Sequence, residues 1–240
     1  MRATKFEFRY RFWLIGAIFW AGFWLYAVDH VNAAAAIAAW LAPHTGLSET
    51  LLIRLLFAFG ALLAVAAALL RTWASSFLSS DVVHDTDVHS ERLVADGPYR
   101  YVRNPLYLGT TLMTLGMGLL ASRLGYAVIV IGVLIFHLRL IGREELELKA
   151  SQGESYRNYL RRVPRLLPSL TPRVDAAGRA SQWKQAFLGE GFMWGFAATT
   201  VVFAATINLE YFDITLVAAF AIYLWSKVTL RKQRHAVTGE

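Results

Sequence analysis

Long runs of apolar residues alternate with short polar, arginine-rich stretches along most of this chain. A helix needs roughly 20 apolar residues to cross the hydrocarbon core of a bilayer, or somewhat fewer where flanking residues reach the interface. Six segments fit this pattern, at 12–28, 51–70, 105–121, 125–141, 192–207 and 212–226. The apolar stretch 33–42 is too short to span and predicts a partial helix at the outer surface. The pattern therefore predicts an all-α, polytopic bundle of about six transmembrane helices.

The basic residues predict the orientation of this bundle, because Lys and Arg gather in cytoplasmic loops. The N-terminal arm, the segments after the second and fourth runs, and the C-terminal tail are all basic. Residues 29–50 and 208–211 contain neither Lys nor Arg. The alternation predicts an inner-membrane protein with both termini in the cytoplasm. The first run is longer than the apolar region of a signal peptide and crowded with Trp and Phe, so we interpret it as a retained helix.

Composition supports a membrane protein and excludes several kinds of chemistry. Of the 240 residues, 56% are hydrophobic, and the net charge is +7. This charge suits cytoplasmic loops facing anionic lipid better than nucleic acid, since no recognition motif accompanies it. The chain has no cysteine, which excludes disulfides, thiolate catalysis and Cys-ligated metals. His84 and His89 lie near Asp81, Asp85 and Asp87, but their spacing matches no structural metal signature, and we predict no metal site.

The most informative polar stretch is Gly-Pro-Tyr-Arg-Tyr-Val-Arg-Asn-Pro-Leu-Tyr at 97–107, directly before the third apolar run. Pro105 suits the first position of a helix, whose backbone amides would offer a place for an anion. Two arginines and three tyrosines surround this start: Arg100, Arg103, Tyr99, Tyr101 and Tyr107. The arginines could clamp a carboxylate, and the tyrosine rings could face an adenine or a sulfonium cation. The alternative is a membrane-interface belt, where Arg and Tyr are common anchors.

A second polar cluster, Glu144 and Glu145, follows the fourth run, although acidic charge is unfavourable at a helix C-terminus. Neighbouring helical residues point about 100° apart, so the two carboxylates cannot face one partner equally. One could accept from a ribose diol while the other pairs with Arg or Lys; the alternative is a solvated helix end. Residues 143–162 predict an amphipathic helix that Gly153 interrupts. We interpret His137 as a packed or interhelically bonded residue.

Several motifs in one order carry a family resemblance. Leu-Val-x-x-Gly-Pro-Tyr-Arg-x-Val-Arg-Asn-Pro-x-Tyr-Leu-Gly spans 93–109; the Glu pair, Gly-x-x-Tyr-x-x-Tyr at 153–159 and Val-Pro-Arg-x-x-Pro at 163–168 follow. Together they resemble the isoprenylcysteine carboxyl methyltransferase family in its broad bacterial branch, which includes phospholipid N-methyltransferases. The resemblance covers roughly 71–168. It divides the chain into N-terminal helices at 1–70, a methyltransferase core at 71–168, an interfacial linker at 169–190, and the last two helices with a basic tail at 191–240.

The resemblance implies an S-adenosylmethionine-dependent enzyme whose cofactor lies in a cytoplasmic pocket of the helical hairpin and the following amphipathic helix. The implied cofactor-binding residues are Pro98, Tyr99, Arg100, Arg103, Asn104, Pro105, Tyr107, Leu108, Gly116, Gly118, Glu144, Glu145, Tyr156 and Tyr159. Arg103, Glu144 and Arg162 are the implied catalytic residues. The two arginines would orient an acceptor carboxylate, whereas an amine acceptor would lose a proton to Glu144, Glu145 or a loop histidine. Asn104 stands where the family usually has His, which favours a binding role, since Asn does not titrate.

The implied partner is a membrane lipid or a lipidated small molecule that enters sideways from the bilayer. We expect a prenylcysteine-like carboxylate as the acceptor, with a phospholipid amine as the alternative. Methyl transfer from a sulfonium needs no metal, because positioning and desolvation supply the rate. An NADPH-dependent lipid or sterol reductase and a non-catalytic scaffold are further alternatives. Small residues such as Gly116 and Gly118 also serve close helix packing, and nothing in the pattern favours one oligomeric state.

Overall fold

The structure, a computed structural model, describes residues 2–78 and 95–238, with side chains described as far as residue 225. The predicted loop histidines, His84 and His89, lie outside these residues. The regular secondary structure of the described part is entirely helical, as the apolar pattern predicted, and this part contains no strand. Its helices are α1 (Lys5–Arg9), α2 (Arg11–Trp24), η1 (Leu25–Ala27), α3 (Ala33–Thr45), α4 (Glu49–Ser75), η2 (Gly97–Arg100), α6 (Pro105–Gly118), α7 (Arg123–Arg162), α8 (Trp183–Gly189), α9 (Gly191–Thr206) and α10 (Leu209–Thr238).

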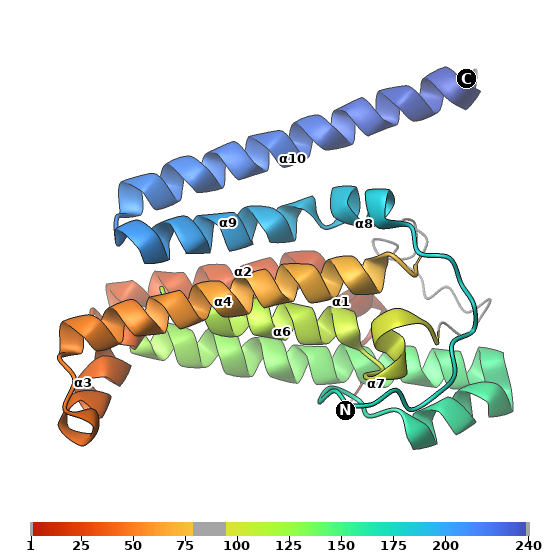
Figure 1. Cartoon of the computed structure of the whole chain (residues 1–240), viewed down its shortest axis with the longest axis horizontal. Helices are drawn as coiled ribbons and strands as arrows, with labels where there is room; N and C mark the ends of the chain where they lie inside the picture. Colours follow the sequence, from red (N-terminus) through yellow and green to blue (C-terminus); the bar gives the residue numbers. More distant parts are fainter. Residues whose placement is uncertain (1, 79–94, 239–240) are drawn as a thin grey trace.

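The long helices run alongside one another in layers (Figure 1). Helix α4 packs against both α6 and α9, α2 packs against α7, and α10 lies outermost against α9. One apolar core joins Ala64 and Ala67 of α4 with Met113 of α6 and with Met193 and Ala197 of α9. Each of the six apolar runs falls on helical chain. These helices pack together because an apolar helix gains stability by burying its surface against another.

Two helices, α4 and α7, are long and apolar enough to cross a membrane. The pair α8 and α9 would add a third span if it counts as one, since the two helices meet at a bend of 63°. The apolar segment Arg11–Ala27 is shorter. Length and composition thus account for two or three spans within the described residues, and the expected six spans stay a prediction.

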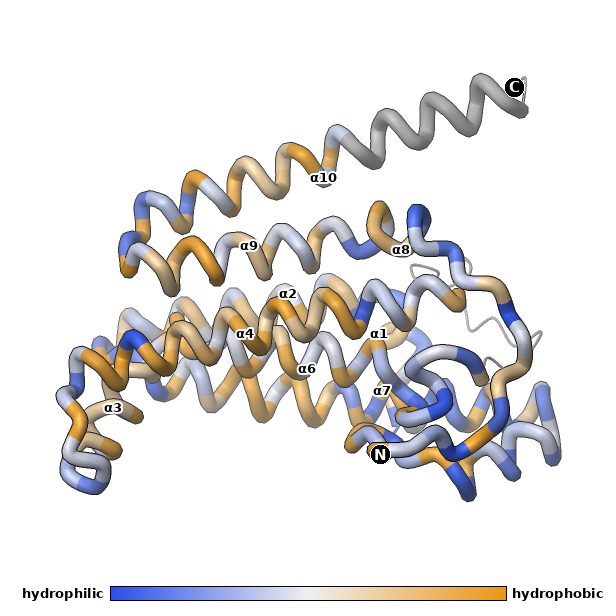
Figure 2. The backbone as a smooth tube through the Cα atoms, viewed as in Figure 1, coloured by the Kyte–Doolittle hydropathy of each residue, from blue (hydrophilic) through white to orange (hydrophobic). Residues whose placement is uncertain are grey.

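The two ends of the bundle differ in character. Helix α3 and the α9–α10 turn lie at one end, whereas η2, α8, the C-terminal part of α7 and both termini lie toward the other (Figure 1). Hydrophilic residues gather at this second end (Figure 2). The arrangement agrees with the Lys/Arg alternation, which assigned all of these segments to one side. That this side is the cytoplasm stays a prediction.

Two pairs of glycines let the helices approach closely. Gly60 of α4 faces Gly116 of α6, and a Cβ added to Gly60 would lie 2.9 Å from the Gly116 carbonyl oxygen. Gly22 of α2 faces Gly125 of α7 in the same way. Because backbone meets backbone at both places, a larger side chain cannot be accommodated by a rotamer change.

An ion pair closes the end of the bundle where α3 lies. Arg123, the first residue of α7, donates to Asp29 at 2.9 Å, and the Leu124 amide also donates to this carboxylate at 2.9 Å. The guanidinium and the amide hold the pKa of Asp29 at about 2. Nearby, Asn32 donates to the carbonyls of Leu119 and Ala121. These bonds tie the α2–α3 connection to the α6–α7 turn.

We expect Asp29→Asn to lower the melting temperature of the detergent-solubilised protein at neutral pH. A carboxylate whose pKa is depressed contributes stability above its unfolded pKa of about 4 and loses it as the pH falls through the folded value. The difference from wild type should therefore hold from about pH 8 to about pH 5 and shrink toward pH 2. Glu49→Gln, an exposed change at the same end, is the control. A difference that does not depend on pH would contradict the assignment.

Candidate active site

Tyr107 and Glu144 meet at the polar end of the α6–α7 hairpin. Pro105 starts α6, so Tyr107 lies in its first turn, and α7 continues past its apolar part to bring Glu144 opposite. The Tyr107 hydroxyl donates to Glu144 Oε1 at 2.6 Å. A short hydrogen bond to a carboxylate is among the strong ones, because one partner is charged. It fixes a half-buried acid beside the start of α6.

Glu145 points elsewhere and is almost fully buried. Its carboxylate lies 3.1 Å from Arg103 Nη1 and also accepts from Arg165, at 3.2 Å from the Arg165 Nε. The side chains of Glu145 and Arg103 are only 7% and 14% exposed. One carboxylate therefore holds two guanidinium groups, while the Arg103 Nε is buried with no hydrogen-bond partner among the described residues. The two neighbouring acids thus have different partners, as their 100° separation on the helix predicted.

The chain that follows α7 folds back over the polar stretch 97–107. The Arg103 amide donates to the Pro164 carbonyl at 2.9 Å, and Asn104 Nδ2 donates to the Arg165 carbonyl at 3.0 Å. The proline in Val-Pro-Arg cannot continue a helix, so α7 ends at Arg162 and the chain turns here. This return brings Arg165 to the same carboxylate as Arg103. The Asn104 side chain therefore serves a backbone contact of this loop.

The tyrosines of the sequence motif at 153–159, Tyr156 and Tyr159, form one packed cluster with their neighbours. Tyr156 and Tyr159 pack with Ala95 and Val163, and the Tyr159 hydroxyl donates to the Tyr99 carbonyl at 2.8 Å. Both rings are about 95% buried. The cluster joins the last turns of α7 to η2, beyond the helix break at Gly153, whose positive φ of 59° suits glycine.

Residues 163–182 form a strap, by which we mean the irregular chain between α7 and α8. Ser169 donates from its amide to the Tyr101 carbonyl, and the Gln182 amide donates to the Ser76 carbonyl. Arg100 Nε donates to the Val174 carbonyl at 3.0 Å. Arg100 thus holds the strap in place, a contact that sequence reasoning did not anticipate because the strap has no periodic pattern.

A polar pair continues the site into the bundle. Thr111 of α6 lies 3.1 Å from His137 Nδ1 of α7, and the Tyr107 and His137 rings meet edge to face at 5.1 Å between centroids. The Thr111 hydroxyl also donates to the Tyr107 carbonyl at 2.9 Å. The Thr111 hydroxyl therefore lies within hydrogen-bond distance of both groups, while the buried His137 Nε2 has no hydrogen-bond partner among the described residues. The expected interhelical bond of His137 is therefore present.

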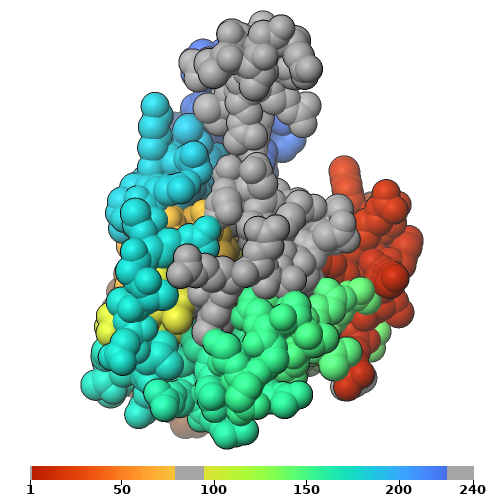
Figure 3. All heavy atoms as spheres, turned by 90° about the vertical axis from the view of Figure 1, so that its right-hand side faces the viewer, coloured from red at the N-terminus to blue at the C-terminus, as the bar shows by residue number. Residues whose placement is uncertain are grey.

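The N-terminal arm lies along α7 next to these residues. Glu7 accepts a two-pronged contact from Arg139, which lowers the pKa of Glu7 to about 2. The Ala3 amide donates to the Arg139 carbonyl at 3.0 Å. Seen from this end, α7 lies at the base with the N-terminal arm on one side and the strap on the other (Figure 3).

Most of the implied cofactor residues lie around this hairpin end, and a few lie apart from it. The residues at this end are Pro98, Tyr99, Arg100, Arg103, Asn104, Pro105, Tyr107, Glu144, Glu145, Tyr156 and Tyr159. Leu108 is partly buried in the same turn of α6. Arg162 is exposed at the last position of α7. Gly116 contacts Gly60 of α4, and Gly118 faces the Tyr126 ring. Gly116 lies nine positions after Tyr107 along α6, a rise of about 14 Å.

The fold and this end of the hairpin define a helical membrane protein with a buried polar site where its apolar helices end. The model of the phospholipid methyltransferase family matches residues 55–152, which confirms the resemblance seen in the sequence motifs. The match includes Arg103, Tyr107, Glu144 and Glu145 and ends before Tyr156. Comparisons with curated proteins and with solved structures found no match. The family and the apolar helices together indicate an integral membrane methyltransferase.

Proposed function

We propose that the protein transfers a methyl group from S-adenosylmethionine to the amine of a lipid in the bilayer. The observation that carries the proposal is that the two neighbouring acids, Glu144 and Glu145, have different partners. Glu145 is ion-paired with Arg103 and Arg165, whereas Glu144 accepts a hydrogen bond from the Tyr107 hydroxyl and has Arg11 as an electrostatic neighbour. A carboxylate held by a hydroxyl rather than by two guanidinium groups can receive a proton or meet a positive group of a ligand. The description of the matching family, phospholipid methyltransferase, agrees with an amine acceptor.

The residues present fit such a cofactor. No side chain among the described residues caps the start of α6, so its first amides can face an anion such as the cofactor's carboxylate. The buried Arg103 Nε is a further donor without a partner among the described residues. Glu144 would meet the cofactor's ammonium or ribose hydroxyls, and the ring of Tyr107 would face the sulfonium. The candidate site therefore offers groups for both signs of charge. The cofactor needs both, because it carries a negative carboxylate together with a positive ammonium and a positive sulfonium.

When bound, S-adenosylmethionine supplies an electrophilic methyl group on a positively charged sulfur. The acceptor nitrogen must first lose a proton, because only its free electron pair can form the new N–C bond. As that bond forms, the C–S bond breaks and its electron pair goes to the sulfur. Glu144 receives this proton at its carboxylate, while Tyr107 holds the carboxylate in place through its 2.6 Å hydrogen bond.

A prenylcysteine-type carboxylate is the second candidate acceptor, and one observation favours it. Arg103, Arg165 and Glu145 together carry one net positive charge, which suits an anionic group of the substrate. A carboxylate acceptor needs no general base. In that reaction Glu144 would act only on the cofactor.

The test is transfer of labelled methyl from S-adenosylmethionine to vesicles of phosphatidylethanolamine and to prenylcysteine analogues, followed by mild base. We expect base-stable label in the lipid headgroup, since an N–CH3 bond survives treatment that releases methanol from an ester. Label released as methanol would favour the carboxylate instead. Thermal stabilisation of the purified protein by S-adenosylhomocysteine but not by NADPH is expected as well. Stabilisation by NADPH but not by S-adenosylhomocysteine would overturn the proposed methyltransferase activity and favour the reductase.

A further inference from the structure

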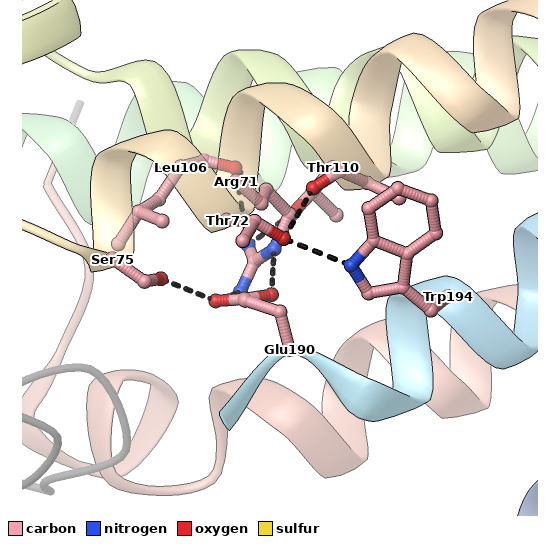
Figure 4. A network of polar contacts seen from close by, with 8 residues as sticks. Arg71, Thr72, Ser75, Leu106, Thr110, Glu190 and Trp194 are labelled. Atoms are coloured by element: carbon pink, nitrogen blue, oxygen red, sulfur yellow. Dashed lines mark hydrogen bonds and ion pairs between the residues drawn. The ribbon is translucent and has the colours of Figure 1, made fainter. Parts of the chain in front are cut away.

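Glu190, at the bend between α8 and α9, is completely buried and lies outside the segment that matches the family. It accepts from Arg71 Nε at 2.7 Å, from Arg71 Nη2 at 3.1 Å and from the Ser75 hydroxyl at 2.6 Å (Figure 4). Arg71 and Ser75 belong to the last turns of α4. A charge in the interior is costly unless it is paired and hydrogen-bonded, and here every carboxylate oxygen has a donor.

The other side of the Arg71 guanidinium holds the first turns of α6. Arg71 Nη1 donates to the Leu106 carbonyl at 3.1 Å and to the Thr110 hydroxyl at 2.8 Å (Figure 4). The stem of Arg71 lies against Gly109, where any side chain would collide with it. The planar guanidinium presents its donors in a fixed fork, so its orientation toward Glu190 also sets its orientation toward α6.

These contacts lie next to the candidate active site. Leu106 is adjacent to Tyr107, and Thr110 is one turn further along the helix. Arg71 therefore holds α6 from the α4 side, while Tyr107 reaches Glu144 on the α7 side. A rotation or shift of this first turn would move the Tyr107 hydroxyl directly.

Holding α9 against α4 does not by itself require a charge. Met193 and Ala197 of α9 already pack into the apolar core with Ala64 and Ala67, and Trp194 Nε1 donates to Thr72 at 3.0 Å. Apolar residues of similar volume often match or exceed a buried ion pair in stability. The charged pair therefore points to a use other than attachment of the C-terminal helices.

We propose that Glu190 is a positioning residue of the active site: through Arg71 it orients the first turn of α6 and with it Tyr107. The α8–α9 segment then completes the methyltransferase site, although it lies outside the family match. This inference rests on the proposed function. It also assigns a purpose to the C-terminal helices, which the sequence left open.

The first test compares Glu190→Gln with Trp194→Phe, which removes a hydrogen bond from the same α4–α9 interface without touching Arg71. Methyl transfer from labelled S-adenosylmethionine to phosphatidylethanolamine vesicles is measured beside melting temperature. We expect Glu190→Gln to lower kcat about 10- to 100-fold, because small displacements of reacting groups cost rates of this size. Trp194→Phe should keep wild-type kcat. Equal kcat values for the two variants would overturn the inference.

A second variant separates positioning from stability. Arg71→Met combined with Glu190→Leu replaces the pair by apolar side chains, which should restore a melting temperature close to wild type. The α6 contacts of Arg71 stay absent, so we expect kcat to stay low. Recovery of kcat along with stability would show a purely structural pair and overturn the inference.

The two hypotheses fail in different ways. A wild type that neither binds S-adenosylhomocysteine nor transfers methyl to phosphatidylethanolamine or prenylcysteine analogues would overturn the proposed function and the inference with it. A wild type that is active while Glu190→Gln keeps its kcat would overturn the inference alone. If Glu190 acts through Tyr107, the loss in the double variant Glu190→Gln/Tyr107→Phe should be no larger than in Tyr107→Phe alone.

Discussion

Glu144→Gln should lower kcat for methyl transfer about 100-fold or more while the protein keeps its melting temperature. Glutamine preserves the size of the side chain and can still accept the hydrogen bond from Tyr107, but it cannot receive a proton. Loss of a general base typically costs about 100- to 10,000-fold in rate. The measurement is initial rate with labelled S-adenosylmethionine and phosphatidylethanolamine vesicles, beside thermal unfolding in detergent.

Tyr107→Phe is the companion to this variant, because it removes the hydrogen bond and leaves the carboxylate. Its loss of kcat should be smaller than that of Glu144→Gln, since the acid is retained but less well held. Binding of S-adenosylhomocysteine separates a loss of chemistry from a loss of cofactor. Wild-type turnover of phosphatidylethanolamine in Glu144→Gln would remove Glu144 as the base, and the amine would then lose its proton to another group.

The second large effect is on stability. Glu145→Ala should destabilise the protein by about 3 kcal/mol, because removal of one partner of a buried ion pair leaves the other uncompensated. Arg103, whose side chain is 14% exposed, would lose its counter-ion, and Arg165 would lose the contact that holds the chain after α7 against that helix. We expect a marked fall in melting temperature and faster proteolysis within the strap, residues 163–182.

Glu154→Ala is the matched control for this prediction. Glu154 also pairs with two arginines on α7, Arg157 and Arg161, but at 3.4 Å and with all three side chains at least 59% exposed. Exposed ion pairs contribute little, so this change should leave the melting temperature almost unchanged. Similar effects of the two substitutions would mean that Glu145 is not the central counter-ion of the site.

The contrast between Glu144 and Glu145 was partly foreseeable. Helical geometry alone requires two neighbouring acids to face different partners, and the expectation that one meets an arginine agrees with the structure. Which acid does so depends on where Arg103 and Arg165 are brought. That in turn depends on the turn at Pro164, which no local pattern of charges specifies.

For the two glycines of the third apolar run, the sequence left two roles open. Gly116 and Gly118 were assigned to the cofactor by resemblance, while small residues also favour close helix contacts. The structure places Gly116 against Gly60 and Gly118 against Tyr126. Their role in binding the cofactor stays a prediction, but helix packing already accounts for the small residue at both positions.

The sequence by itself determined where the helices lie, because apolar periodicity and length act locally, and its linked motifs carried the resemblance to a methyltransferase family whose model matches residues 55–152. It also singled out the two polar clusters that the fold brings together at the end of the α6–α7 hairpin. Only the tertiary structure decided the partners of the buried charges. Arg71 and Glu190 are 119 positions apart, and neither belongs to a motif. A buried charge is satisfied by whatever donor or acceptor packing brings within about 3 Å, and this choice is made by the fold as a whole.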